Sequence, residues 1–235
     1  MVKNKNIICI VQARLNSNRL PGKILKKINK KNNVLEFLIK RLKKSKKISK
    51  IVITCPDTSE DKKIIKKLEK HKVNFFKGSE LNVLDRYFKT AKKFKAHAII
   101  RVTADCPFTD PKLIDKFLDR FFKFKYDYFS NINPPTFPDG FDIEIFNFKS
   151  LKFAWENASS SYDQEHVTPY LRKSKKIKKG NFSLKKDYSK LRITLDNQND
   201  LELIRHIAKK LNPDKYFSWK KILGKLKMIQ KNEIE

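Results

Sequence analysis

The sequence predicts an α/β fold in which helices cover both faces of a mostly parallel sheet, giving three layers. Two observations predict it. Short runs of apolar and β-branched residues alternate with longer amphipathic stretches from residue 7 to residue 122. These runs are apolar at nearly every position, which is typical of strands buried on both faces of a parallel sheet.

The individual elements follow from local patterns. The helix over 34–45 has leucine and isoleucine residues on one face, the helix over 59–71 has acidic residues in its first turn, and Asp110-Pro111 is a helix start. The expected strands are 7–11, 51–55, 73–76, 98–102, 126–131, 142–148 and 191–195. The expected helices are 34–45, 59–71, 83–94, 113–122 and 201–211, with one more in the last twenty residues.

Length and composition predict one domain. The 235 residues are 40% hydrophobic and contain no polar linker, so we expect a single domain over 1–235, with 212–235 as a C-terminal helical extension. Cys9, Cys55 and Cys106 have no metal-like spacing and are expected to be reduced thiols. No apolar segment near the N-terminus has the length of a signal peptide or membrane span, so we expect a cytoplasmic protein.

The formal net charge of +30 raises the question of nucleic-acid binding. The excess is mostly lysine, and these lysines are spread along the chain without one basic helix or one patch studded with aromatic residues. A solvated lysine surface is therefore favoured over a nucleic-acid interface. A basic nucleic-acid-binding protein remains the alternative outside the enzymes.

The segment VQARLNSNRLPGK directly follows the first predicted strand. Arg14, Ser17, Arg19 and Lys23 can surround a polyphosphate, because guanidinium groups match phosphate oxygens and lysine adds a mobile charge. The Pro21-Gly22 pair predicts a tight turn. The segment is not a GxxxxGK[ST] loop, which argues against a P-loop ATPase. The alternative is that these arginines are only surface residues of a long loop.

Two aspartates follow other predicted strands. Asp105 lies in RVTADCP, and Asp196 lies in LRITLDNQNDLELI. Because ligands of open α/β sheets bind at the carboxyl ends of the strands, we expect the two carboxylates to hold Mg²⁺ beside the phosphates. Each could instead be a turn or capping residue, and Asp200 is well placed near a helix start.

Six motifs in this order carry a resemblance to a known family: QARLNSNRLPGK, GSELNVLDRYFKTA, RVTADCP, PDGFDIEIF, EHVTPYL and LRITLDNQNDLELI. Over residues 5 to 211 the chain resembles the SpsF-like branch of the cytidylyltransferases, of spore-coat polysaccharide biosynthesis. It is more distantly similar to acylneuraminate and 3-deoxy-manno-octulosonate cytidylyltransferases. The resemblance implies a Rossmann-like nucleotide-diphospho-sugar transferase fold, usually dimeric. It also implies Mg²⁺-dependent transfer of CMP from CTP to an acidic sugar or related acceptor, with release of pyrophosphate.

The resemblance also implies roles for single residues. Arg14 and Lys23 match the triphosphate-binding, catalytic arginine and lysine, with Arg19 as a helper. Asp105 and Asp196 match the metal-binding aspartates. The adjacent Asp85 and Arg86 match the region that approaches the nucleotide base. The sequence departs from the family's pattern at three positions: Asn16 and Asn18 replace the frequent glycine and threonine, and Ala104 replaces the usual glycine.

Two further segments are expected to bind the acceptor. FPDGFDIEIF brings three carboxylates around a glycine turn, where they can hydrogen-bond sugar hydroxyls or add a metal ligand. DQEHVTPYL begins an amphipathic segment, and its lone histidine has a structural role as its alternative. The acceptor-binding candidates are Asp139, Asp142, Glu144, Glu165, His166 and Tyr170.

One rival class within the enzymes stays open. Another nucleotidyltransferase, or a glycosyltransferase of the same fold, would use the same loop and carboxylates with another base or a preformed nucleotide sugar. Against the glycosyltransferase, no DxD pair ends a mid-chain strand; Asp105 lies in ADCP.

Overall fold

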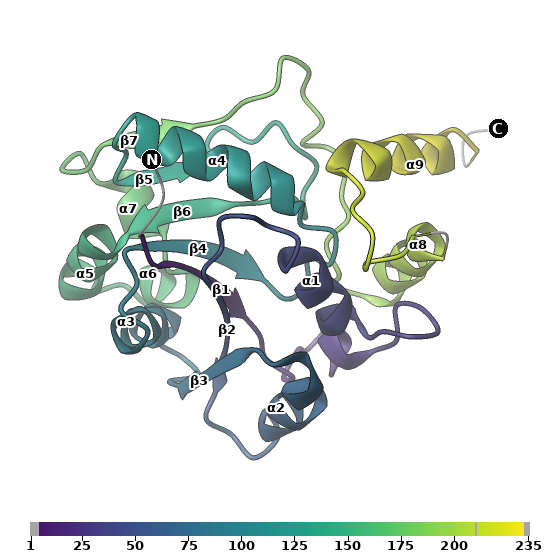
Figure 1. The fold of residues 1–235 in the computed structure, drawn as a ribbon, viewed down its shortest axis with the longest axis horizontal. Helices are drawn as coiled ribbons and strands as arrows, with labels where there is room; N and C mark the ends of the chain where they lie inside the picture. Colours follow the sequence, from purple (N-terminus) through teal and green to yellow (C-terminus); the bar gives the residue numbers. More distant parts are fainter. Residues whose placement is uncertain (1–4, 210, 233–235) are drawn as a thin grey trace.

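The computed structural model of the protein, which describes residues 5–209 and 211–232, contains a seven-stranded sheet in the order β3-β2-β1-β4-β6-β5-β7 (Figure 1). Only β6 is antiparallel to its neighbours, β4 and β5; the other pairs are parallel. The prediction of a mostly parallel sheet is confirmed. The strands are β1 (Ile7–Gln12), β2 (Lys50–Pro56), β3 (Asn74–Gly78), β4 (Ala98–Thr103), β5 (Tyr128–Ser130), β6 (Glu144–Asn147) and β7 (Lys179–Asn181).

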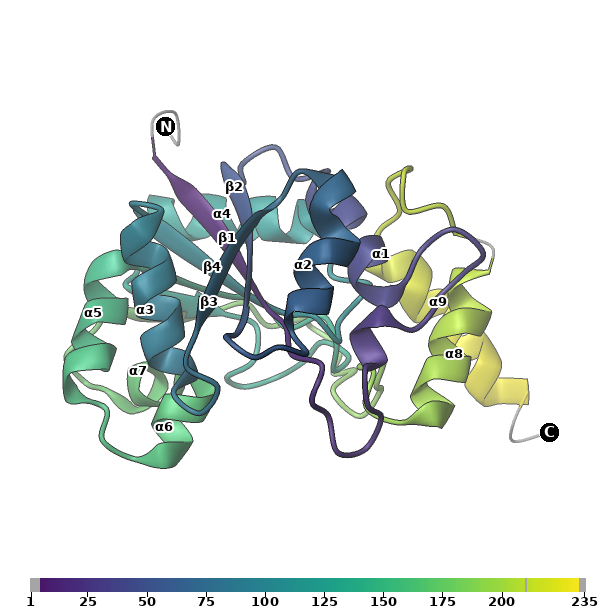
Figure 2. The ribbon, with the colours of Figure 1, turned by 90° about the horizontal axis from the view of Figure 1, so that it is seen from below.

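Helices cover both faces of this sheet, as Figures 1 and 2 show together. One face carries α3, α5, α6 and α7, and the other carries α1, α2 and α4, with α8 and α9 beyond them. The α-helices are α1 (Val34–Leu42), α2 (Lys62–Leu68), α3 (Val83–Lys93), α4 (Pro111–Lys123), α5 (Phe148–Asn157), α6 (Ser161–His166), α7 (Pro169–Lys173), α8 (Gln198–Ala208) and α9 (Trp219–Asn232). Two short 3-10 helices are η1 (Lys23–Leu25) and η2 (Glu69–His71).

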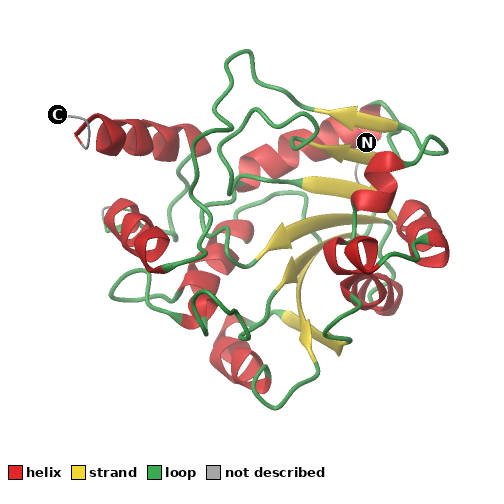
Figure 3. Cartoon of the chain, turned by 180° about the vertical axis from the view of Figure 1, so that it is seen from behind, coloured by secondary structure: helices red, strands yellow, loops and turns green. Residues whose placement is uncertain are grey.

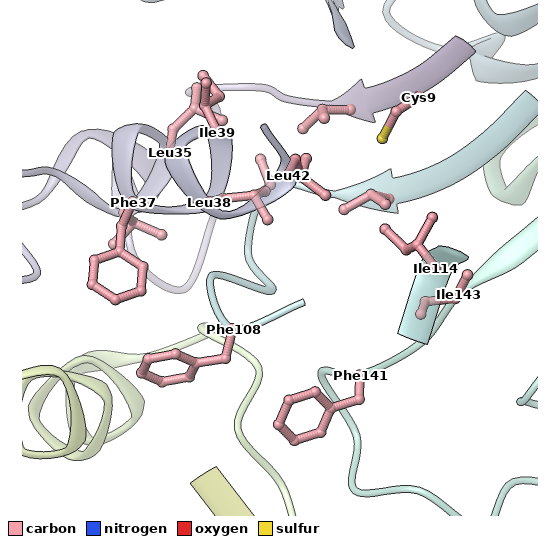
Figure 4. Close-up of a cluster of buried hydrophobic side chains, with 14 of the residues drawn as sticks. Cys9, Leu35, Phe37, Leu38, Ile39, Leu42, Phe108, Ile114, Phe141 and Ile143 are labelled. Carbon is pink, nitrogen blue, oxygen red and sulfur yellow. The ribbon is translucent and has the colours of Figure 1, made fainter. Parts of the chain in front are cut away.

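The strand pattern explains the two cores. In β1, the odd-numbered Ile7, Cys9 and Val11 pack into one hydrophobic cluster, whereas Ile8 and Ile10 pack into the other. Successive side chains of a strand point to opposite faces, so a strand covered on both sides is apolar at nearly every position. Figure 4 shows the first cluster, in which the apolar face of α1 packs against β1 and its neighbours.

Capping residues in the sequence mark where two of the helices begin. Asn33 caps α1 in a capping box with Glu36, whose backbone N–H donates to Asn33 Oδ1 at 2.7 Å. Asp110 caps α4, with Pro111 as the first helical residue. The expected helix over 59–71 is shorter than predicted, because α2 begins only at Lys62 and gives way after Leu68 to η2.

The predicted strand over 191–195 is wrong. This segment makes only one isolated bridge, between Asp139 and Arg192, and joins no ladder of the sheet. Its backbone bonds go to loops instead: the Leu195 N–H donates to the Asp105 carbonyl at 2.9 Å. The apolar pattern was real, since Ile193 and Leu195 are buried, but an extended segment packed on a core has the same pattern as a strand.

The sequence reasoning also missed α5, β7 and the separate helices α6 and α7. They are short, so each contains too few apolar residues to show a pattern. Leu151 and Ala154 of α5 and Leu171 of α7 are buried in the core formed with α3, whereas α6 and β7 contribute no residue to that cluster. In the described part of the chain, no helix is both long and apolar enough to cross a membrane.

The C-terminal region packs on the rest of the molecule. Phe217, Ile222 and Leu226 are buried in the larger hydrophobic cluster. Buried Arg41 of α1 donates from Nη2 to the Phe217 carbonyl at 3.3 Å and stacks on its ring, with 3.8 Å between the guanidinium carbon and the ring centroid. The expected C-terminal helix is confirmed as α9; residues 233–235 lie outside the described residues.

Figure 3 shows the loops after the strands gathered on the side of the sheet that faces α8 and α9.

Candidate active site

The loop that follows β1 is closed by its own backbone and by one buried carboxylate. The Gly22 N–H donates to the Leu15 carbonyl at 3.0 Å, and the Leu15 N–H donates to Asp61 Oδ1 at 2.9 Å. Gly22 has φ +65°, the left-handed conformation that glycine adopts without steric cost. The turn predicted from Pro21-Gly22 therefore returns the chain to Leu15, and Lys23 follows directly after it.

A pocket of about 360 Å³ lies between this loop and the ends of β1 and β4. Six predicted site residues line it, so the structure brings together the expected phosphate-binding and metal-binding groups. They are Arg14, Ser17, Arg19, Lys23, Asp105 and Asp196. Sequence reasoning missed Gln12, Glu80 and Thr103, which also line it; Gln12 and Thr103 end β1 and β4 and pair in the sheet.

Lys23 joins the two predicted metal ligands. Its Nζ lies 2.9 Å from Asp105 Oδ2, 2.9 Å from Asp196 Oδ1 and 2.7 Å from the Leu195 carbonyl oxygen. The exposed Arg19 also reaches Asp196, with 2.8 Å between Nη2 and Oδ1. The loop, the end of β4 and the segment before α8 thus meet at one ammonium group.

The charges at this point stabilise one another. Burial alone would lower the pKa of Lys23, but Asp105 and Asp196 raise it above its ordinary value. Burial would raise the pKa of Asp196, but Lys23, Arg19 and Arg192 lower it below its ordinary value. At neutral pH the lysine is therefore a cation and Asp196 an anion.

The residues fit a divalent cation. Lys23 places a positive group between two carboxylate oxygens, which is the position that a small metal ion bound by both aspartates would take. Mg²⁺ prefers oxygen ligands and is commonly held by one or two carboxylates together with substrate phosphates. Among the described residues, no group of three or more acidic, histidine or cysteine side chains is placed to hold a metal ion by itself.

Asp85 and Arg86 are not brought into this pocket. Asp85 accepts a hydrogen bond from Trp155 Nε1 at 3.0 Å and pairs with Lys89 at 2.8 Å. Arg86 is buried, and its Nη1 donates to the Ser79 carbonyl oxygen. Burial lowers the pKa of Arg86. In this structure both side chains bind neighbouring protein groups, and their approach to a nucleotide base stays a prediction.

The carboxylates after the Pro-rich turn have three different environments. Asp139 pairs with Arg192, with 3.2 Å between Oδ2 and Nε. Glu144 is buried and pairs with Arg101 across β4 and β6, with 3.1 Å between Oε1 and Nη1. Asp142 is exposed. None of the three lines the 360 Å³ pocket, so their contact with an acceptor stays a prediction.

The candidates near α6 and α7 also lie outside that pocket. Glu165 and His166 are exposed at the end of α6, and the His166 ring lies 4.5 Å from the Tyr162 ring between centroids. Tyr170 packs against Phe153, with 5.6 Å between ring centroids. Their role in acceptor binding remains a prediction too.

The pKa of Asp142 predicts how the stability of the protein depends on pH. Desolvation by the surrounding protein, followed by the negative charges of Asp139 and Glu144, raises the pKa of Asp142 to about 7. A folded-state pKa above the ordinary value means that stability is lost as pH rises from the unfolded pKa towards 7. We therefore expect Asp142→Asn to raise the melting temperature at pH 8, with a gain that shrinks towards pH 5. Solvent reaches this carboxylate, so the gain is smaller than full burial would produce. A gain that is equal at pH 5 and pH 8 would contradict the raised pKa.

The departures from the family's pattern are accommodated without backbone strain. Asn16, Asn18 and Ala104 do not have positive φ. The alanine therefore adopts this conformation as readily as a glycine.

A larger hollow, about 850 Å³, lies between the segment 27–32 and α8. Its rim carries Lys27, Lys30 and Arg205, and none of the predicted site residues lines it. The smaller pocket, which contains the converging charges, is therefore the candidate active site.

Comparisons with known proteins agree with this arrangement. The family model described as cytidylyltransferase matches residues 8–231. The spore coat polysaccharide biosynthesis protein SpsF of Bacillus subtilis is 32% identical over 213 residues, which are 87% of each chain. A cytidylyltransferase of Leptospira borgpetersenii has a TM-score of 0.90 and 30% identity, covering 98% of this chain and 96% of the other. A CMP:2-keto-3-deoxy-manno-octonic acid synthetase in complex with CTP shares the fold, with a TM-score of 0.65 and 14% identity, over 86% of this chain and 98% of the other.

The fold of these structures is the Rossmann-like α/β fold expected here, and the resemblance to the SpsF-like proteins is confirmed. The match extends over the β1 loop, Asp105 and Asp196. The chain belongs to the cytidylyltransferase family and is a nucleotidyltransferase.

Proposed function

We propose that this enzyme transfers CMP from CTP to an acidic sugar or related acceptor, with Mg²⁺ as the metal, and releases pyrophosphate. The supporting observation is the Lys23 ammonium between Asp105 and Asp196, in a pocket that also contains Arg14 and Arg19. We further propose a role in surface polysaccharide or glycan biosynthesis, by a cytoplasmic homodimer in which residues 1–235 form one domain and 212–235 its C-terminal extension. The likeness to SpsF supports the pathway.

The proposed mechanism follows from the charges. An acceptor hydroxyl oxygen forms a bond to the α-phosphorus of CTP and releases its proton to solvent, while the bond from the α-phosphorus to the bridging oxygen breaks and its electron pair leaves with pyrophosphate. Arg14 and Lys23 bind the β- and γ-phosphates and stabilise the negative charge that develops on them. Ser17 and Arg19 orient the triphosphate from the same loop. Asp105 and Asp196 would hold Mg²⁺, which supplies further charge stabilisation to the phosphates.

Nucleotide binding tests this proposal first. A ligand that binds only the folded protein raises its stability by about 2.7 kcal/mol at 100 times its Kd. For a domain of this size we expect CTP with Mg²⁺ to raise the melting temperature by about 5–10 °C. ATP, GTP and UTP are the controls, each measured with and without Mg²⁺.

The outcomes separate the rival functions. A shift selective for CTP and enlarged by Mg²⁺ supports cytidylyl transfer and justifies an acceptor screen by pyrophosphate release. A larger shift with another nucleotide would favour a different nucleotidyltransferase. No shift with any nucleotide, together with salt-dependent binding to duplex DNA, would favour the nucleic-acid-binding alternative.

A further inference from the structure

Arg192 contacts three carboxylates at once. Its Nε lies 3.2 Å from Asp139 Oδ2, its Nη1 lies 2.8 Å from Asp200 Oδ1, and its Nη2 contacts Asp196 Oδ2. Burial opposes the charge of this side chain, but Asp200, Asp196 and Asp139 raise the pKa of Arg192 above its ordinary value. A planar guanidinium has donors in fixed directions, so it holds the three acidic groups in fixed relative positions.

The two oxygens of Asp196 have different partners. Oδ2 accepts from Arg192, whereas Oδ1 lies 2.9 Å from Lys23 Nζ and 2.8 Å from Arg19 Nη2. The side chain is only 14% exposed, so solvent does not compete freely for either oxygen. The contact with Arg192 therefore determines that Oδ1 is the oxygen presented to the β1 loop.

Asp200 holds the backbone beside Asp196. Its Oδ2 accepts from the backbone N–H of Asp196 at 2.8 Å and of Asn197 at 2.9 Å, while its Oδ1 accepts from Arg192. Asn197 caps α8 in a capping box with Asp200. Asp196 is thus fixed through both its side chain and its main chain.

Arg192 is itself held by the turn that carries Asp139. The Asp139 N–H donates to the Leu191 carbonyl at 2.9 Å, and the Ile193 N–H donates to the Asp139 carbonyl at 2.8 Å. The next residue, Gly140, has φ +104°, and a Cβ there would lie 2.9 Å from Ile193 Cγ2. Glycine is required for this close approach.

We propose that Arg192 is a positioning residue that orients Asp196 Oδ1 towards the divalent cation of the bound metal–CTP complex. The inference rests on the proposed function, because the cation is needed only if nucleotidyl transfer occurs here. Asp139 is then a partner of Arg192, and its contact with an acceptor stays a separate prediction. Groups that hydrogen-bond a metal-ligating carboxylate typically change metal affinity 10–100-fold when removed.

The test is a Mn²⁺ titration of the full chain in saturating CTP, followed by electron paramagnetic resonance. We expect Arg192→Gln to raise the Kd for Mn²⁺ about 10–100-fold. Arg192→Lys restores the charge but not the three-way geometry, so a rise of at least about tenfold should remain. The matched control is Arg205→Gln on α8, which removes the same charge from a residue that binds only the Lys27 carbonyl oxygen among its described contacts. It should leave the Kd unchanged.

A second variant covers a loss of folding in Arg192→Gln. Asp139→Asn leaves Arg192 and α8 intact and weakens one of the three contacts, so we expect a smaller rise in the Mn²⁺ Kd. Wild-type affinity in both Arg192 variants, or full restoration by lysine, would overturn the positioning role. If the wild-type protein binds no Mn²⁺ in the presence of CTP, the proposed function fails instead.

Discussion

We expect Lys23→Ala to lower the rate of cytidylyl transfer at least about 100-fold, the typical effect of removing one group that stabilises developing charge. The same substitution should raise the Kd for CTP about 10–100-fold, because a charge-assisted hydrogen bond contributes roughly 1.5–3 kcal/mol. Isothermal titration with CTP and pyrophosphate release with an acceptor found by screening measure the two effects. Lys30→Ala, which removes an exposed lysine elsewhere, is the matched control.

Lys23→Ala should weaken the binding of CTP but strengthen the binding of metal to the protein without CTP. In the structure the Lys23 ammonium lies between the oxygens that are proposed to hold Mg²⁺. Without it, Asp105 and Asp196 are left with fewer positive partners, so Mn²⁺ should bind the free Lys23→Ala protein more tightly than the wild type. Unchanged turnover and unchanged CTP affinity in this variant would remove Lys23 from the proposed site.

Asp105→Asn should have an effect of similar or larger size. A bound metal contributes several kcal/mol of charge stabilisation, and each 1.4 kcal/mol or so is a factor of ten in rate. We therefore expect turnover to fall at least about 1,000-fold if Asp105 holds the ion. CTP alone should bind as tightly as before or more tightly, since a negative charge beside the triphosphate has been removed, but Mg²⁺ should no longer strengthen its binding.

The affinity for CTP alone and the enhancement of that affinity by Mg²⁺ together distinguish metal binding by Asp105 from a structural role. Loss of packing would weaken CTP binding with and without Mg²⁺, whereas loss of a metal ligand removes only the enhancement by Mg²⁺. Asp119→Asn on α4 is the control, because Asp119 is an exposed carboxylate paired with a different lysine, Lys47. A full Mg²⁺ enhancement in Asp105→Asn would show that Asp105 does not hold the metal.

Local sequence patterns determined most of the fold. Runs that are apolar at nearly every position predicted β1, β2 and β4, since most side chains of a strand covered on both faces are buried in apolar surroundings. The same reasoning failed at 191–195. This segment is extended and makes only an isolated bridge, between Asp139 and Arg192, yet it has the same pattern of apolar residues as a strand of the sheet. Short helices such as α6 and α7 contain too few turns to show a period.

The sequence by itself also predicted six of the residues that line the pocket beside the β1 loop, although not Gln12, Glu80 or Thr103. Arg14 and Lys23 follow β1, Asp105 follows β4, and the carboxyl ends of parallel strands share one edge. Asp196 reaches the same pocket from the extended segment over 191–195, which is not a strand of the sheet. Only the tertiary structure decided which of these charged side chains contact one another. The contacts of the Lys23 ammonium with Asp105 and Asp196, and of Arg192 with Asp139, join residues far apart in the chain. Such contacts depend on distances of a few ångströms, which no local pattern specifies.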